Sequence, residues 1–84
     1  MKRIRLSKHA VEQAVERGAT EAEIRKTIEQ GVREPAKHGR FLYRHNFQFR
    51  DVWNGQHYAI KQVAPVVAER QNEIVVVTVY TFYF

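Results

Sequence analysis

Glu73–Phe84 reads EIVVVTVYTFYF, and this stretch decides the fold. β-branched and aromatic residues fill nearly every position, and no Gly, Pro or charge follows Glu73, a pattern typical of a β-strand. Both faces of such a strand have to be covered, because an apolar strand left open aggregates. The stretch is also shorter than the roughly 20 apolar residues that a membrane-spanning helix needs. We therefore expect the rest of the chain to cover this strand, and we expect no membrane partner.

The two faces of this strand differ in chemistry. Because side chains alternate along a strand, one face should carry Val75, Val77, Val79, Thr81 and Tyr83. The other should carry Ile74, Val76, Thr78, Tyr80, Phe82 and Phe84. We expect the first face to be core. We expect a site on the second face, where Thr78 and Tyr80 bring two hydroxyls side by side.

A short strand and a helix are predicted at the start of the chain. Residues 3–6 alternate basic and apolar side chains, which is typical of an edge strand. Ser7 is a suitable N-cap for a helix that should end at Gly18. His9 then lies in the first turn of this helix and Arg17 in its last turn.

A second helix and a connector follow. Thr20 and Glu23 have the spacing of a capping box, which predicts a helix from about residue 21 to residue 30, with Gly31 as its stop. Residues 33–39 contain Glu-Pro and a glycine, so we expect a connector there.

Asn54-Gly55 predicts a two-residue hairpin turn. Counting outward from this turn pairs Trp53 with Gln56 and, farther along, Gln48 with Lys61. In this register one face carries the apolar side chains Phe47, Phe49, Tyr58 and Ile60. The other face is basic and polar, and carries Gln48, Arg50, His57 and Lys61.

These elements predict one α+β domain over residues 1–84. Their order is β-α-α-β-β-β, and we expect a two-layer structure in which both N-terminal helices pack on one face of an antiparallel sheet.

Composition limits the function classes. The chain has no cysteine, which excludes thiolate chemistry and disulfides and fits a cytoplasmic location. The N-terminus lacks the apolar run of a signal peptide. Fourteen Lys and Arg against nine Asp and Glu give a formal charge of +5, which favours RNA, DNA or an acidic protein as partner. The same charge also serves solubility.

A set of short motifs resembles a known group of proteins. The motifs are Ser7-Lys8-His9-Ala10, Glu16-Arg17-Gly18 before the capped second helix, Gly39-Arg40 with Tyr43, and Val76-Val77-Thr78-Val79-Tyr80. Together they resemble a family of small bacterial domains of unknown function that is grouped with the RelE/ParE-like toxins and, more distantly, with the barnase, EndoU and colicin nuclease fold. The resemblance implies a metal-independent ribonuclease or toxin that a small antitoxin neutralises. Its matching positions here are His9, Arg17, Tyr43, Thr78 and Tyr80.

Metal-free RNA cleavage needs a general base, a general acid and cations that stabilise the crowded phosphorane. Histidine suits the first two roles, and Arg or Lys suits the third. Our catalytic candidates are His9, Arg17, Lys61, His57 and Tyr80. Our RNA-binding candidates are Arg50, Tyr43, Gln48 and Thr78. His38 and His45 lack metal-ligand spacing, so we expect neither a metal site nor a cofactor.

Each candidate also has a purely structural explanation. His9 can hydrogen-bond within its own helix, and Arg17 can serve the helix dipole. Lys61 and Arg50 can belong to the solvated face of an ordinary sheet. An alternative function therefore stays open, that of a catalytically inert interaction module or homodimer that uses the C-terminal aromatic strand and a sheet edge.

Overall fold

The computed structural model describes residues 2–84 and has an α+β fold. In chain order its elements are β1 (Arg3–Leu6), α1 (Lys8–Arg17), α2 (Glu21–Gln30), β2 (Val32–Pro35), the 3-10 turn η1 (Lys37–Gly39), β3 (Phe41–Trp53), β4 (Gln56–Glu69) and β5 (Glu73–Tyr83). Within residues 2–84, neither helix has the length and apolar character needed to cross a membrane.

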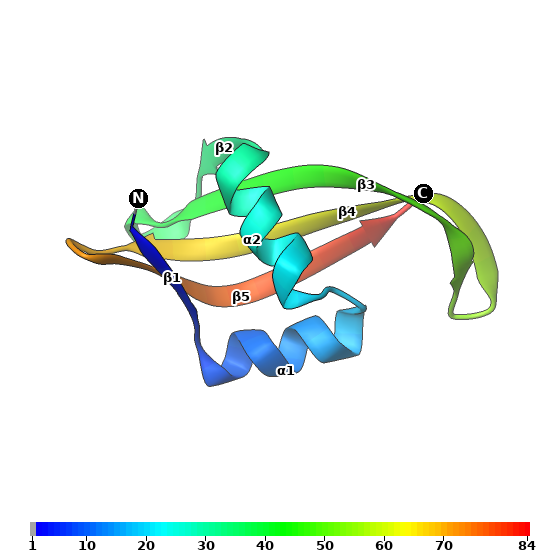
Figure 1. The fold of residues 1–84 in the computed structure, drawn as a ribbon, viewed down its shortest axis with the longest axis horizontal. Coiled ribbons are helices and arrows are strands. Elements are labelled where there is room, and N and C mark those ends of the chain that lie inside the picture. The colour runs from blue at the N-terminus through cyan, green and yellow to red at the C-terminus, as the bar shows by residue number, and fades with distance from the viewer. Residues whose placement is uncertain (1) are drawn as a thin grey trace.

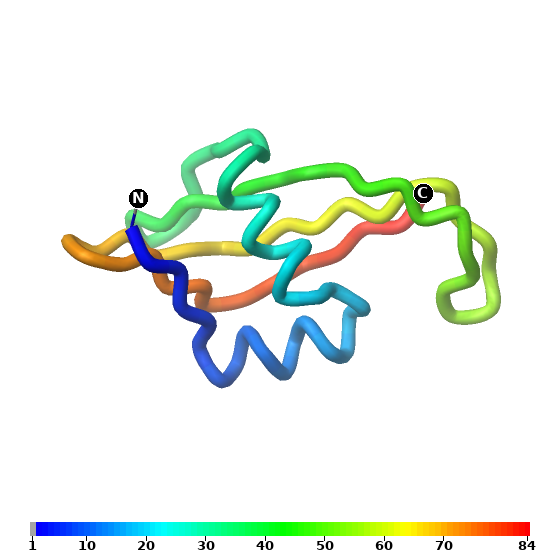
Figure 2. The backbone as a smooth tube through the Cα atoms, in the orientation of Figure 1, coloured from blue at the N-terminus to red at the C-terminus, as the bar shows by residue number. Residues whose placement is uncertain are grey.

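The strand order is β1-β5-β4-β3-β2, so the C-terminal strand lies inside the sheet. α2 crosses β3 and β4, and α1 lies along β5 on the same side of the sheet (Figure 1). The tube in Figure 2 shows β3 and β4 as a long hairpin that bends over at its tip. Within residues 2–84, the other side of the sheet carries no α-helix, and we call it the open face.

Two features of the sheet differ from the sequence prediction. β2 (Val32–Pro35), of which we placed residues 33–35 in a connector, pairs with β3 as an edge strand. The proline stands at the end of this strand, where its missing N–H costs no ladder bond. In addition, β1 pairs with β5 in parallel, so the sheet is mixed and not purely antiparallel. A parallel neighbour needs a long crossover connection, and all the elements between β1 and β5 supply it.

The predicted helix ends are confirmed. Ser7 Oγ accepts a hydrogen bond from the backbone N–H of Ala10 at 3.1 Å. Thr20 and Glu23 form the complete capping box, with each side chain bonded to the other's backbone N–H. α1 ends at Gly18, whose φ of 78° is the left-handed conformation that glycine adopts without strain.

One hydrophobic core lies between the helices and the sheet. The helices contribute Ala10, Ala14, Ile24 and Ile28, and the turn between them contributes Ala19. The strands contribute Ile4, Tyr43, Val63, Val67, Ile74, Val76 and Val79. Tyr43 is only 8% exposed, so the side chain that we expected to bind RNA is a core residue.

A β-bulge in β5 changes the predicted division of its faces. Val66 pairs with Thr78 but Val67 pairs with Val76, so Val77 is an extra residue in the strand. Each bulge reverses the side-chain alternation beyond it. The helix side therefore carries Ile74, Val76, Val79, Thr81 and Tyr83, and the prediction was wrong for the residues before the bulge. Thr78, Tyr80 and Phe82 lie on the other face, as we expected.

The hairpin register is confirmed at the turn and wrong farther along. Trp53 pairs with Gln56, but a second irregularity at Phe49 and Arg50 makes Gln48 pair with Ile60 and Phe47 with Lys61. Arg50 adopts a positive φ of 46° there, which fits a bulge. The one-residue slip turns Lys61 to the helix side, away from the basic face where we had placed it.

Lys61 and its neighbours hold the corner between the two helices. The Lys61 ammonium, on a residue only 7% exposed, lies 2.9 Å from Glu23 Oε2 and donates to the Gly18 carbonyl at 2.9 Å. The Tyr83 hydroxyl donates to the Arg17 carbonyl at 2.7 Å. Trp53 stacks on the Tyr83 ring with their centroids 4.8 Å apart. A side chain at Gly18 would collide with both rings, because an ideal Cβ there lies 2.6 Å from the Tyr83 hydroxyl.

Replacing Lys61 should destabilise the fold. We expect Lys61→Ala to lower the free energy of unfolding by about 3 kcal/mol, because it leaves a carboxylate of a largely buried pair without its partner. Urea unfolding followed by circular dichroism measures this change. Lys26→Ala, at an exposed position of α2, is the matched control and should stay within about 0.5 kcal/mol of the parent. Equal effects of the two substitutions would show that the pair does not hold the corner.

Tyr83 should make the fold sensitive to alkali. Burial raises the pKa of the Tyr83 phenol, so above pH of about 10 the unfolded chain loses this proton first. Below pH of about 10, Tyr83 should therefore cause no change in the free energy of unfolding. Above it, this free energy should fall as the pH rises through the raised pKa of Tyr83. Urea unfolding at increasing alkaline pH should show a smaller fall for Tyr83→Phe. An unchanged fall in that variant would assign the alkaline loss to other groups.

Candidate functional site

The open face of the sheet is built from the outward side chains of β3, β4 and β5. Leu42 pairs with Val66, and Val66 pairs with Thr78, so these three form one row across the strands. Beside this row, Arg44 bonds to the Gln62 side chain at 3.0 Å and to Glu34 at 3.4 Å. Glu34 is therefore a carboxylate of this face that already has a cationic partner.

A hollow of about 390 Å³ lies on this face. The η1 turn and its flanks form one side of it, and β5 forms the other. Its lining residues are Pro35, Ala36, Lys37, His38, Arg40, Leu42, Val66, Thr78 and Tyr80. No carboxylate is among the described residues of this lining, whereas a lysine, an arginine and a histidine are. The hollow therefore favours an anion on electrostatic grounds.

His38 holds an unusual backbone conformation at the rim of this hollow. Its φ of 63° and ψ of 33° are left-handed, which is uncommon for a residue other than glycine. The turn places Lys37 and Arg40 on either side of His38, and all three are exposed. The basic side chains that line the hollow thus come from one short segment.

Two side chains of α1 extend this surface along the edge of β5. Arg17 donates to the Val79 carbonyl at 2.7 Å, and its guanidinium carbon lies 5.0 Å from the centre of the Tyr80 ring. His9 Nε2 lies 3.4 Å from Thr78 Oγ1. Within residues 2–84, Arg17 has no carboxylate within 4.0 Å. The backbone carbonyl of Val79 holds the Arg17 guanidinium in place but is uncharged, so it does not neutralise the positive charge.

The structure brings together four of the nine residues that the sequence singled out. His9, Arg17, Thr78 and Tyr80 lie together along β5. Of the other five, Tyr43 is in the core, Lys61 is under the helices, and Gln48, Arg50 and His57 lie on the arms of the hairpin.

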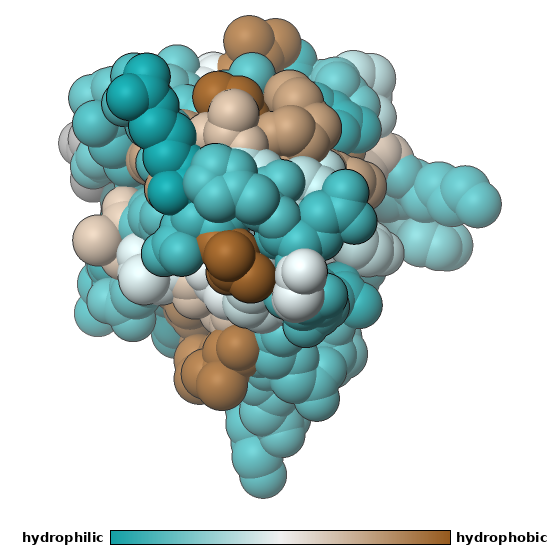
Figure 3. Space-filling model, turned by 90° about the vertical axis from the view of Figure 1, so that its right-hand side faces the viewer, coloured by the Kyte–Doolittle hydropathy of each residue, from teal (hydrophilic) through white to brown (hydrophobic). Residues whose placement is uncertain are grey.

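The hairpin is remote from the cluster on β5. His57 pairs with Val52 near its tip, and this tip projects at the opposite end of the molecule from the start of α1, where His9 lies (Figure 1). Figure 3 views the molecule from the hairpin end, where small apolar patches are separated by hydrophilic side chains. His9 and His57 therefore do not form an acid–base pair.

Sequence reasoning missed the η1 turn. Lys37, His38 and Arg40 are three basic residues within four positions shortly after a proline. This local pattern was the one sequence feature that could have indicated a basic turn. We weighed His38 only as a metal ligand. Within residues 2–84, no group of three or more His, Cys, Asp or Glu side chains is placed to hold a metal ion.

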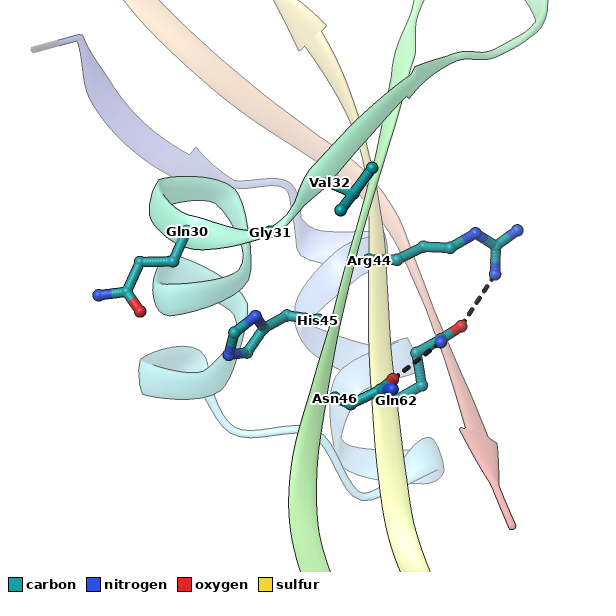
Figure 4. A pocket seen from close by; sticks show the side chains of 7 residues that line it. All are labelled: Gln30, Gly31, Val32, Arg44, His45, Asn46 and Gln62. Carbon is teal, nitrogen blue, oxygen red and sulfur yellow. Dashed lines mark hydrogen bonds between the residues drawn. The ribbon is translucent and has the colours of Figure 1, made fainter.

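A second hollow, of about 430 Å³, lies beside β3 at the junction between the end of α2 and the start of β2 (Figure 4). His45 points toward α2, whereas Arg44 and Gln62 lie on the other side of β3 (Figure 4). Gln62 also donates to Asn46 at 2.9 Å, so several polar groups around this hollow already bond to one another. It offers less unsatisfied charge than the hollow beside η1.

Comparison with known proteins gives a family but no activity. A family model described as a domain of unknown function (DUF4258) matches residues 6–81. No curated protein and no solved structure matches the chain significantly. The match spans both helices, the η1 turn and β5 up to Thr81, and thus all the residues of the site.

Proposed function

Because the chain belongs to the DUF4258 family of domains of unknown function, we propose its function from the site itself: it binds RNA across the open face of the sheet and cleaves it without a metal ion. The hollow beside η1 carries this proposal, because Lys37, His38 and Arg40 line it and no described carboxylate does. Arg17 extends the positive charge along β5. Phosphate contacts by Lys and Arg provide most of the affinity of such surfaces for nucleic acid.

We assign the chemistry to two histidines, His9 and His38. His9 contacts the Thr78 hydroxyl from α1, and His38 lines the hollow to which Thr78 belongs. In the proposed reaction one imidazole takes the proton of the ribose 2′-hydroxyl, whose oxygen attacks the adjacent phosphorus. The other imidazole protonates the departing 5′-oxygen. The products are a 2′,3′-cyclic phosphate and a free 5′-hydroxyl, and Arg17 stabilises the negative charge that develops in between.

We also propose a small acidic protein as the regulator of this surface. A basic face with few carboxylates favours an acidic partner through electrostatic complementarity. Such a partner would exclude RNA by occupying the same groups. This is the arrangement that the resemblance to toxin–antitoxin systems implies for the sequence.

RNA binding should depend on the η1 turn. Fluorescence anisotropy of a labelled, unstructured RNA measures affinity over a series of salt concentrations. Lys37→Ala and Arg40→Ala should weaken binding, and each should reduce the slope of log affinity against log salt by about 0.7, the contribution of one single-strand phosphate contact.

Lys26→Ala removes the same charge from an exposed position of α2, on the side of the sheet that the helices cover. It should leave the salt slope unchanged. The proposal is wrong if Lys26→Ala weakens binding as much as the η1 variants do, or if the parent protein does not bind RNA even at low salt.

Cleavage should require His9 and His38 and tolerate EDTA. His9→Ala and His38→Ala should each reduce the rate by about 10²- to 10⁴-fold, the usual contribution of a general acid or base. His57→Ala, on the hairpin, is the matched control and should keep the parent rate. Cleavage that EDTA abolishes, or that is equally sensitive to His57→Ala, would contradict this mechanism.

A further inference from the structure

Within residues 2–84, the exposed Phe, Tyr and Trp side chains all lie at the C-terminal end of β5. Tyr80 is 43% exposed, Phe82 44% and Phe84 56%, whereas the other Phe, Tyr and Trp side chains are buried or half-buried. The three are alternate residues opposite Ala64, Gln62 and Ile60 of β4. They therefore form a row on the open face, which begins at the hollow that Tyr80 lines.

Cations accompany the first two rings of this row. The Arg17 guanidinium carbon is 5.0 Å from the centre of the Tyr80 ring, and that of Arg44 is 5.6 Å from the centre of the Phe82 ring. Each of these two rings thus lies next to a guanidinium group, and the guanidinium of Arg44 is also paired with the Glu34 carboxylate. Aromatic faces next to basic groups are the features with which proteins hold single-stranded nucleic acid.

We propose that Tyr80, Phe82 and Phe84 form a stacking platform for unpaired bases, so that the substrate class is single-stranded RNA. This inference rests on the proposed function, because the same strand leads into the phosphate-binding hollow. Bases stack on the rings while the phosphates that join them lie near Arg17, which has no carboxylate partner within residues 2–84. A duplex presents no free base faces and gains only the phosphate contacts.

The spacing of the rings supports unpaired bases in particular. Alternate residues of a strand are about 7 Å apart, roughly twice the 3.4 Å rise between bases of a duplex strand. Successive bases can each lie on a ring only when they have separated from one another. An extended single strand meets this condition and a duplex does not.

Charge argues against a second copy of this chain as the occupant. A two-fold dimer through the open face would bring the basic turn and Arg17 of one copy toward the same groups of the other, or leave them at its rim. The chain carries a formal charge of +5, so this contact is repulsive, whereas an RNA strand neutralises it.

The test compares two ligands and three variants at one residue. The ligands are a short labelled oligouridylate, whose bases stack weakly on one another, and an RNA duplex with the same number of phosphates. Phe82→Ala and Phe82→Leu should weaken oligouridylate binding about tenfold and leave duplex binding unchanged. Phe82→Trp keeps a ring and should retain the parent affinity. Phe82→Leu distinguishes stacking from simple apolar contact, because leucine keeps apolar bulk but has no aromatic face.

Sedimentation and circular dichroism accompany the binding measurements. Phe82 is exposed, so all three variants should fold and remain in the parent's oligomeric state. Equal losses for both ligands, or an unaffected Phe82→Leu, would overturn the platform while leaving RNA binding by the η1 turn intact. A parent dimer that Phe82→Ala dissociates would assign the row to self-association instead. Absence of binding to either ligand would overturn the proposed function together with the platform.

Discussion

The position of the whole site depends on how the corner between α1 and α2 is held. Lys61 bonds to the Gly18 carbonyl and to Glu23, and Tyr83 bonds to the Arg17 carbonyl. The backbone carbonyls at the end of α1 thus receive donors from two neighbouring strands, which satisfies groups that a helix end leaves open. This attachment fixes α1 along β5. The Arg17 guanidinium can then reach the edge of that strand and lie next to Tyr80.

Two bulges decide which side chains serve the core and which serve the open face. Val76 and Val79 both face the helices although they are three positions apart. In a regular strand they would face opposite sides, and the extra residue Val77 brings them to the same side. The irregularity at Phe49 and Arg50 likewise turns Lys61 toward the helices, where it forms an ion pair with Glu23. The site and the scaffold are therefore separated by local backbone changes and not by the hydrophobic pattern alone.

The sequence predicted the elements better than their registers. Both capped helices, the Asn54-Gly55 turn and the C-terminal strand could be read from local chemistry, because capping and turn residues act within a few positions. A bulge leaves no comparable local mark, and a single missed residue reverses every face beyond it. For this reason Thr78 and Tyr80 were placed on the correct face while Lys61 was not. The η1 turn could not be predicted as part of the site, because its basic residues line a hollow with Thr78 and Tyr80 only once the sheet has formed.

The parallel pairing of β1 with β5 joins the first and the last strand of the domain. Arg3 lies opposite Glu73, and Ser7 donates to the Val76 carbonyl, so these contacts close a loop that contains nearly all the remaining residues. Loop closure on this scale is entropically costly and occurs late relative to local hairpins and helix turns. On the ribosome, α1 lacks the strand on which it mainly packs until β5 has emerged. His9 and Arg17 therefore reach Thr78 and Tyr80 only after β5 has been synthesised, and before that point the nascent chain carries the parts of the site without the site itself.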